Sequence, residues 1–218
     1  MEPERRLLEV DLRHAQDHVR FDASGWATDA FAETSTAMTF FRDYPIRQAN
    51  FVGPPGWYLE RAGFWHGACG PASCWAGGAQ GLIDYALKHT RDTNPHALAH
   101  LGALQANGWL LRTLLQAAGE EIDQDFENVH GARVRALMLR HLVEHACTET
   151  IVRFGRAFGP RPLAFEAQIA RRCHEVSLYI RQSHAESDLE ELGRQSLFRE
   201  KNSQQARESG GADAPVRA

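Results

Sequence analysis

Apolar side chains recur at helical spacing through most of the chain after about residue 60. Hydrophobic positions three and four residues apart form a stripe along one side of a helix, and here they predict four long helices. The expected helices cover about 61–90, 95–118, 121–157 and 164–192. Short breaks containing Gly, Pro, Asp or Asn separate them, as is typical of helix ends. Four long helices with short connections predict an up-and-down four-helix bundle, so the fold class is mainly α.

The preceding stretch, residues 5–59, alternates short extended runs with turn residues. Residues 7–12 and 37–41 are predicted strands, and Asp22-Ala23-Ser24-Gly25 is a predicted turn. Three or four strands of this kind would form a small open sheet with exposed pairing edges, so they look like part of a larger β unit. The expected organisation is a partial antiparallel β domain over 1–59, the bundle over 60–193 and a disordered tail over 194–218.

Small residues crowd the first expected helix, because glycine and alanine make up most of residues 67–81. Each glycine costs a helix roughly 1 kcal/mol of intrinsic propensity, so this helix needs tertiary support. A face of small residues allows a neighbouring helix to approach closely. That neighbour could belong to the same chain or to a second copy, and the sequence leaves both alternatives open.

The composition is that of an ordinary soluble protein. The chain has 218 residues, 43% of them hydrophobic, and a formal net charge of -4, so it offers no basic field for nucleic acid. No apolar run approaches about 18 residues and no signal sequence is recognisable, so we expect no membrane partner and a cytoplasmic location. The cysteines lack CxxC spacing, which favours buried, reduced thiols. They are Cys69, Cys74, Cys147 and Cys173.

Two short motifs resemble known metal-binding motifs. The segment 141–145 (HLVEH) fits H-x-x-E-H, which places two imidazoles one helical turn apart. No third ligand can be assigned, and among 11 histidines a chance match is easy. The segment 127–130 (ENVH) fits the E-x-x-H motif of di-iron bundles, but the chain has no second copy of it. We therefore expect no metal.

Several short motifs follow one another along the chain in a fixed order. They are Gly25-Trp26, Thr34-Ser35-Thr36, the run TFFRDYPI at 39–46, Val52-Gly53, Glu60-Arg61 and then the Gly/Ala-rich helix. In order and spacing, residues 5–193 resemble the end of the middle domain and the C-terminal bundle of acyl-CoA dehydrogenases. The resemblance implies a flavoprotein in which FAD accepts a hydride during α,β-dehydrogenation of an acyl thioester.

The resemblance also implies that other parts of the fold lie outside this chain. The chain corresponds only to the end of the β middle domain and to the bundle, so it would be a portion of the enzyme or would rely on a partner. The thioester could be carried by coenzyme A or by a carrier protein. The bundles of this family self-associate, so a homo-oligomer is implied as well.

The catalytic base of the family is usually a glutamate late in the last helix. Arg171-Arg172 and Tyr179 fit the frame around that position, but Ile180 stands at the position itself and cannot accept a proton. A minority of the family carries the base just before the arginine that opens the first helix of the bundle. That position is Glu60, which becomes the candidate catalytic base.

Four residues are implied to bind the cofactor. Arg91 corresponds to an arginine that reaches the FAD of the neighbouring subunit. Gly159 remains from a glycine motif before the last helix, and Arg161 follows it at a helix end, where it could meet phosphate or simply be solvated. His184 resembles the imidazole of flavin monooxygenases built on the same fold.

Two alternative functions stay open. The chain could be a truncated, non-catalytic helical module for oligomerisation or interaction. It could also belong to a flavin-dependent monooxygenase, in which His184 would matter more than Glu60. Bound flavin separates the interaction module from the two enzymes.

Overall fold

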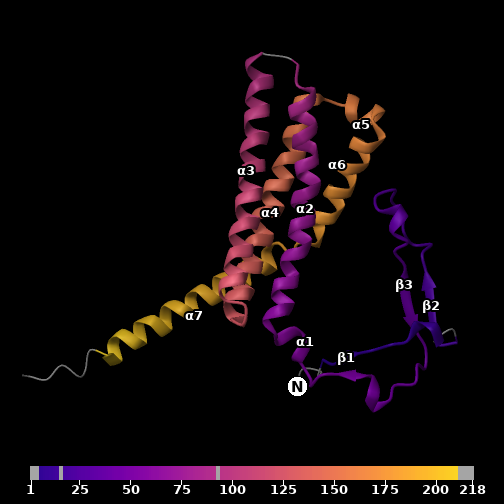
Figure 1. The fold of residues 1–218 in the computed structure, drawn as a ribbon, viewed down its shortest axis with the longest axis vertical. Coiled ribbons are helices and arrows are strands. Elements are labelled where there is room, and N and C mark those ends of the chain that lie inside the picture. The colour runs from indigo at the N-terminus through magenta and orange to yellow at the C-terminus, as the bar shows by residue number, and fades with distance from the viewer. Residues whose placement is uncertain (1–4, 15–16, 92–93, 211–218) are drawn as a thin grey trace, which may run out of the picture.

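The computed structural model describes residues 5–14, 17–91 and 94–210. It is mainly helical, with two small antiparallel sheets near the N-terminus (Figure 1). The helices are α1 Trp57–Glu60, α2 Ala62–His89, α3 Pro95–Gln124, α4 Val129–Phe158, α5 Arg161–Phe165, α6 Ala167–Tyr179 and α7 Glu186–Gly210. Short 3-10 helices cover Leu12–His14, Ala32–Thr34, Gln48–Asn50 and Ile180–Gln182.

The strands pair in two separate ladders instead of one open sheet. They are β1 Leu7–Leu8, β2 Val19–Asp22, β3 Met38–Phe41 and β4 Phe51–Val52. Strand β1 pairs with β4, and β2 pairs with β3, both antiparallel. The predicted strand at 7–12 is therefore shorter than expected, because the chain turns into a 3-10 helix at Leu12. Every residue of β3 is exposed, and Figure 1 shows this hairpin standing apart from the long helices.

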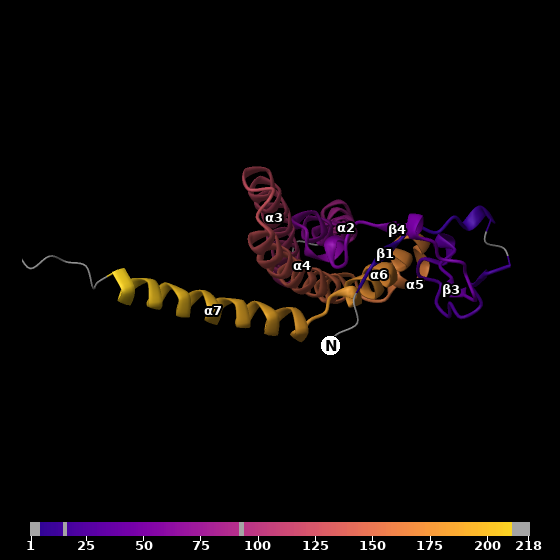
Figure 2. The same ribbon diagram turned by 90° about the horizontal axis from the view of Figure 1, so that it is seen from below.

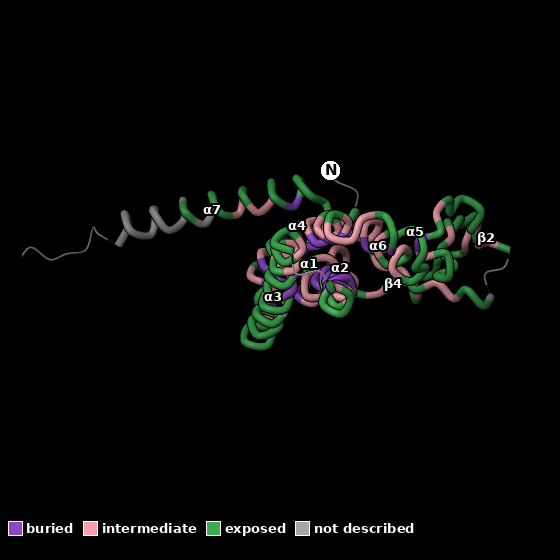
Figure 3. The backbone as a smooth tube through the Cα atoms, turned by 90° about the horizontal axis from the view of Figure 1, so that it is seen from above, coloured by how far each residue is buried: buried purple, intermediate pink, exposed green. Residues whose placement is uncertain are grey.

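Helices α2, α3, α4 and α6, which we call the helical core, pack side by side (Figure 1). Helix α4 lies along both α2 and α3, while α6 packs mainly against α2. The buried residues concentrate where these helices meet, as the colouring of the backbone in Figure 3 shows. The largest of them include Trp75 and Leu82 from α2, Leu111 from α3 and Phe154 from α4.

Some of the small residues of α2 lie against another helix of the same chain. A Cβ atom at Gly78 would overlap Cγ2 of Val176, and one at Gly81 would overlap the guanidinium of Arg172. Both partners lie on α6, so these glycines allow α6 to pack closely against α2. Gly77, by contrast, has no such neighbour within 4 Å.

The break between the second and third helices lies later than the sequence predicts. Helix α3 continues through Gly119 to Gln124, and α4 begins at Val129 instead of 121. The side chain of Asn128 accepts a hydrogen bond from the N–H of Gly131 at 2.8 Å, which caps α4. The cap, and not the glycine, sets this boundary.

The predicted fourth helix at 164–192 is interrupted, and the predicted disordered tail is largely helical. The chain turns between α6 and α7, where Ala185 adopts a left-handed φ of 46°. Helix α7 then continues to Gly210 and extends away from the helical core (Figure 2). Pairs four residues apart, such as Gln195 with Glu191, support it. The rest of the predicted tail, 211–218, lies outside the described residues.

Replacing Gly78 tests the close approach of α2 and α6. We expect Gly78→Ala to lower the free energy of unfolding by about 1–3 kcal/mol, because Val176 is buried and stiff and must move. The matched control, Gly77→Ala, adds a methyl group in open space and should raise stability by up to about 1 kcal/mol. Urea unfolding followed by circular dichroism measures both. Equal effects of the two substitutions would contradict this packing.

Candidate functional site

A cavity of about 450 Å³ lies where the start of α2, the middle of α4 and the junction between α6 and α7 meet. We call this region the α1 end of the helical core, because α1 leads into α2 there. The cavity is lined by Phe64, Trp65, Ala68, Leu137, Arg140, Arg181, Gln182, His184 and Asp188. Apolar side chains of α2 and α4 provide most of the wall area, while the polar groups come from α4 and from the α6–α7 junction.

Arg140 is the most enclosed charge of this cavity. Its Nη2 donates to the carbonyl oxygen of Gln182 at 2.7 Å, and its Nε lies 3.4 Å from Oδ2 of Asp188. Its guanidinium also lies 5.2 Å from the ring centroid of Trp75. Both members of the Arg140–Asp188 pair are buried, so each depends on the other to offset its desolvation. The pair ties the α6–α7 junction to α4.

His184 lies at the edge of the cavity. Its Nδ1 is 3.3 Å from Oδ1 of Asp188, four residues further along the chain. The imidazole is 72% exposed, whereas the Asp188 side chain is 9% exposed. The structure therefore places this predicted residue beside a buried carboxylate and within reach of a ligand in the cavity.

Glu60 lies at the same end of the helical core but does not line the cavity. It is the last residue of α1, and its exposed carboxylate lies against Gly56, where a side chain would overlap it. The rings of Tyr58 and Phe64 meet edge to face at 5.6 Å, which connects α1 to the cavity wall. The carboxylate would have to turn away from Gly56 to reach a ligand there.

Arg91, Gly159 and Arg161 lie at the opposite end, which we call the α5 end. Gly159 ends α4 with a left-handed φ of 64°, a conformation that favours glycine. Arg161 lines a hollow of about 580 Å³ together with Pro160, Ala164 and Phe165. Arg91 is exposed just after α2.

Tyr85 is a polar group of the α5 end that the sequence did not single out. Its hydroxyl donates to Oε1 of Glu166 at 2.6 Å, and this hydrogen bond raises the pKa of Tyr85 to about 12. The phenol therefore stays protonated at neutral pH and acts as a donor, not as a base.

The predicted site residues are divided between the two ends of the helical core. Arg91, Gly159 and Arg161 lie at the α5 end, and Glu60 and His184 lie at the α1 end. Helix α2 separates the ends with its 28 residues, a length of roughly 42 Å. One chain therefore does not bring the five predicted residues together.

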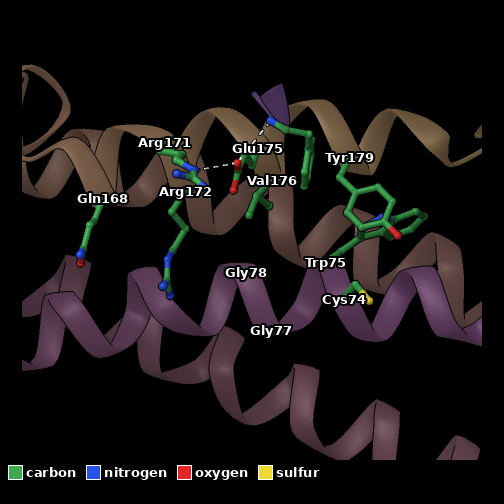
Figure 4. A pocket seen from close by; sticks show the side chains of 11 residues that line it. Cys74, Trp75, Gly77, Gly78, Gln168, Arg171, Arg172, Glu175, Val176 and Tyr179 are labelled. Atoms are coloured by element: carbon green, nitrogen blue, oxygen red, sulfur yellow. Dashed lines mark hydrogen bonds and ion pairs between the residues drawn. The ribbon is translucent and has the colours of Figure 1, made fainter. Parts of the chain in front are cut away.

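A second cleft, of about 600 Å³, runs between α2 and α6 (Figure 4). Arg171 on its rim pairs with Glu175 at 3.0 Å and with Glu33 at 2.9 Å. Phe31 also lines the cleft, and its ring lies edge to face against the ring of Tyr179 with the centroids 5.5 Å apart. These contacts attach the segment before β3 to α6, and in them the single guanidinium of Arg171 is shared by the carboxylates of Glu33 and Glu175.

The side chains of the H-x-x-E-H motif at 141–145 make other contacts in the structure. The rings of His141 and His145 are 6.5 Å apart, and Glu144 accepts from Thr148 at 2.9 Å and pairs with Arg181 at 3.0 Å. Within residues 5–14, 17–91 and 94–210, no group of three or more His, Cys, Asp or Glu side chains could hold a metal ion. In the same ranges, no helix has the length and apolar character needed to cross a membrane.

Three of the four thiols are poor candidates for a nucleophile. Burial raises the pKa of Cys147 to about 12 and that of Cys173 to about 11. Burial also raises the pKa of Cys69. These groups stay protonated at neutral pH and have the low reactivity of buried thiols. Cys74 is exposed in the α2–α6 cleft.

Removing Arg140 tests how far the α1 end depends on the buried pair. We expect Arg140→Met to lower the free energy of unfolding by about 3–5 kcal/mol, because Asp188 is left buried without its cation. The double variant Arg140→Met/Asp188→Leu should recover much of that loss. The control Arg181→Met removes a pair whose arginine is 60% exposed, and should cost less than about 1 kcal/mol. Similar losses for Arg140→Met and Arg181→Met would contradict the proposed dependence.

Comparisons with protein-family models, with curated proteins and with solved structures give no match for this chain. The family resemblance of the sequence therefore remains an expectation. The geometry of the two ends of the helical core carries the functional proposal.

Proposed function

We propose that this chain is the helical portion of an acyl-CoA dehydrogenase-like flavoprotein and acts within an assembly. One observation carries the proposal. Glu60 and His184 lie near opposite ends of the predicted bundle sequence, yet both are at the α1 end of the helical core. His184 lines the cavity there, and α1, which ends at Glu60, contacts the cavity wall through Tyr58 and Phe64. The resemblance gives Glu60 as the base of a dehydrogenase and His184 as the imidazole of a monooxygenase of the same fold.

The order of the elements supports the proposal. Antiparallel strands precede the long helices α2, α3, α4 and α6, as in the middle and C-terminal domains of that family. The hairpin of β2 and β3 leaves Phe21, Met38 and Phe41 exposed. A two-stranded hairpin alone is marginally stable in water, so a further part of the assembly would cover these side chains.

The chemistry assigned to this chain is proton removal. Glu60 would accept the α-proton of an acyl thioester, while the β-hydrogen leaves as hydride, so that a carbon–carbon double bond forms. Bound FAD supplies the acceptor for that hydride. The apolar walls formed by Phe64, Trp65 and Leu137 would exclude water from the reacting carbons.

The cofactor would lie between copies of the chain. Arg91 and Arg161 at the α5 end of one copy would bind its phosphates, while the α1 end of another copy would meet its ring system. The outer side of α3 exposes Leu98, Trp109 and Leu110, and Trp109 is 64% exposed. A homo-oligomer that buries this side would remove apolar surface from water.

The exposed apolar side chains also favour a second candidate, a helical module for oligomerisation or interaction that holds no flavin. A flavin-dependent monooxygenase is the third candidate, and the position of His184 at the cavity favours it. In that enzyme the hydroxylation reaction would depend on His184 and not on Glu60.

Flavin binding separates the enzyme candidates from the interaction module. We expect the full chain, mixed with FAD and passed through gel filtration, to retain absorbance near roughly 370 and 450 nm. Arg161→Leu should weaken FAD binding about tenfold or more, because a charge-assisted bond to phosphate is lost. The control Arg112→Leu changes an exposed arginine of α3 and should leave binding unchanged. A colourless oligomer would overturn the flavoprotein proposal in favour of the interaction module.

The base is tested in the flavin-loaded protein. Glu60→Gln should keep bound FAD but slow its reduction by acyl-CoA thioesters by about 10²–10⁴-fold, because the amide cannot accept the α-proton. Stopped-flow bleaching of the flavin near 450 nm measures the rate. An unchanged rate would show that Glu60 is not the base, and a matching loss in His184→Gln would favour His184 as the base instead.

A further inference from the structure

We propose that the cleft between α2 and α6 binds a free aromatic α-amino acid. The carboxylate of the ligand would pair with Arg172 and its ammonium group with Glu175, while its ring would lie over Gly77. The volume of the cleft, about 600 Å³, is in the range of small-molecule sites. The inference goes beyond the proposed function, because none of the residues assigned to the flavin lines this cleft.

Arg172 is a cation of the cleft that lacks an anion. Its side chain reaches from α6 to α2 (Figure 4), and its guanidinium lies directly over Gly81, where a Cβ atom would overlap it. It makes no hydrogen bond or ion pair with the described residues. The backbone of α2 therefore helps to fix the guanidinium in place, while its donors stay available to a carboxylate.

Glu175 offers the opposite charge one helical turn away. Its Oε1 accepts from Nε of Arg171 at 3.0 Å and from the N–H of Phe31 at 3.3 Å. Its Oε2 accepts no hydrogen bond within the part of the chain that the structure describes. Residues three apart on a helix have Cβ atoms about 5–6 Å apart, yet Glu175 and Arg172 form no ion pair, because each is directed elsewhere. A group that carries both charges can bridge them.

The balance of charges favours a zwitterion over a simple anion or cation. The carboxylates of Glu33 and Glu175 share the single guanidinium of Arg171, so negative charge is in excess there. The guanidinium of Arg172 supplies the matching positive charge without touching them. A carboxylic acid or an amine alone would satisfy one side and leave the other unmatched, whereas the head of an α-amino acid satisfies both.

The apolar part of the cleft begins one further turn along α6. Val176 and Tyr179 line it from α6, and Trp75 lines it from α2 (Figure 4). The surface of α2 is open here, because a Cβ atom at Gly77 would meet nothing within 4 Å. Tyr179 follows Glu175 by four residues, a rise of roughly 6 Å. This short distance suits an aromatic ring joined to the charged head by a single methylene group, and the ring can pack against that of Tyr179.

Cys74 allows binding to be measured by thiol protection. It is exposed in the cleft, whereas Cys69 and Cys147 are buried and Cys173 is half-buried. Burial also raises the pKa of each of these other thiols, so a disulfide reagent such as DTNB should modify Cys74 first.

The probe is L-phenylalanine, added to the full chain without flavin. At ten times its Kd, measured by isothermal titration calorimetry, we expect it to slow the modification of Cys74 about tenfold. Phenethylamine lacks the carboxylate and phenylpropionate lacks the ammonium group. At the same concentration as phenylalanine, each should protect the thiol much less.

Three variants test the assigned contacts by calorimetry. Arg172→Met keeps an apolar stem but removes the charge, so it should raise the Kd for phenylalanine about tenfold or more. Gly77→Leu fills the open space expected for the ring and should also raise the Kd about tenfold or more. The control Arg156→Met changes an exposed arginine of α4 and should leave the Kd unchanged.

Absence of protection by phenylalanine would overturn the inference, and so would equal protection by phenethylamine or phenylpropionate. An unchanged Kd in Arg172→Met would overturn it as well. If Arg172→Met fails to fold, Gly77→Leu decides, because its side chain enters open space and an unchanged Kd there is equally contradictory. Since no flavin is present, these outcomes are independent of the flavin-binding test.

Discussion

The α1 end of the molecule depends on one buried guanidinium. Arg140 reaches three separate segments, because it pairs with Asp188 of α7, donates to Gln182 before the turn and lies 3.5 Å from the carbonyl oxygen of Ala68 on α2. A buried arginine that lost these partners would be strongly destabilising. Its partners therefore fix where α6 ends and where α7 begins. That junction in turn places His184 at the cavity.

The second constraint is the close contact of α2 with α6. Gly78 and Gly81 accept side chains of α6 directly over the backbone of α2, which a larger residue would prevent. Helix α6 in turn receives the N-terminal segment through Phe31 and Glu33. The hairpin beyond that anchor and the outer side of α3 remain uncovered, so the chain presents apolar surface that suits an assembly.

Helical periodicity was sufficient to predict where the long helices lie, but not where they end. Gly119 looked like a stop, yet an exposed glycine inside a helix costs only about 1 kcal/mol, and the Asn128 cap decides the boundary. The break at Ala185 carries no glycine or proline, so no local signal marked it. The prediction of one open sheet was wrong for another reason. The partners of β1 and β2 are set by contacts between residues far apart in sequence.

The residues of the candidate site were likewise only partly predictable from the sequence. His184 was predicted through the family resemblance, and it does line a cavity. Asp188 was missed, because His184 lies in the turn before α7 and helical spacing does not relate the two residues. Arg140 gave no signal at all, because its role exists only once α4 meets the α6–α7 junction. The orientation of the Glu60 carboxylate likewise depends on Gly56 and α1, which the pattern did not resolve.

The central claim is that the two ends of the helical core meet across copies of the chain to form one flavin site. A crystal structure of the full chain grown with FAD tests it most directly. The account predicts flavin phosphates at Arg91 and Arg161 of one copy and the ring system near His184 of another. Flavin bound wholly within one chain, for example in the α2–α6 cleft, or crystals of an oligomer without flavin, would contradict it.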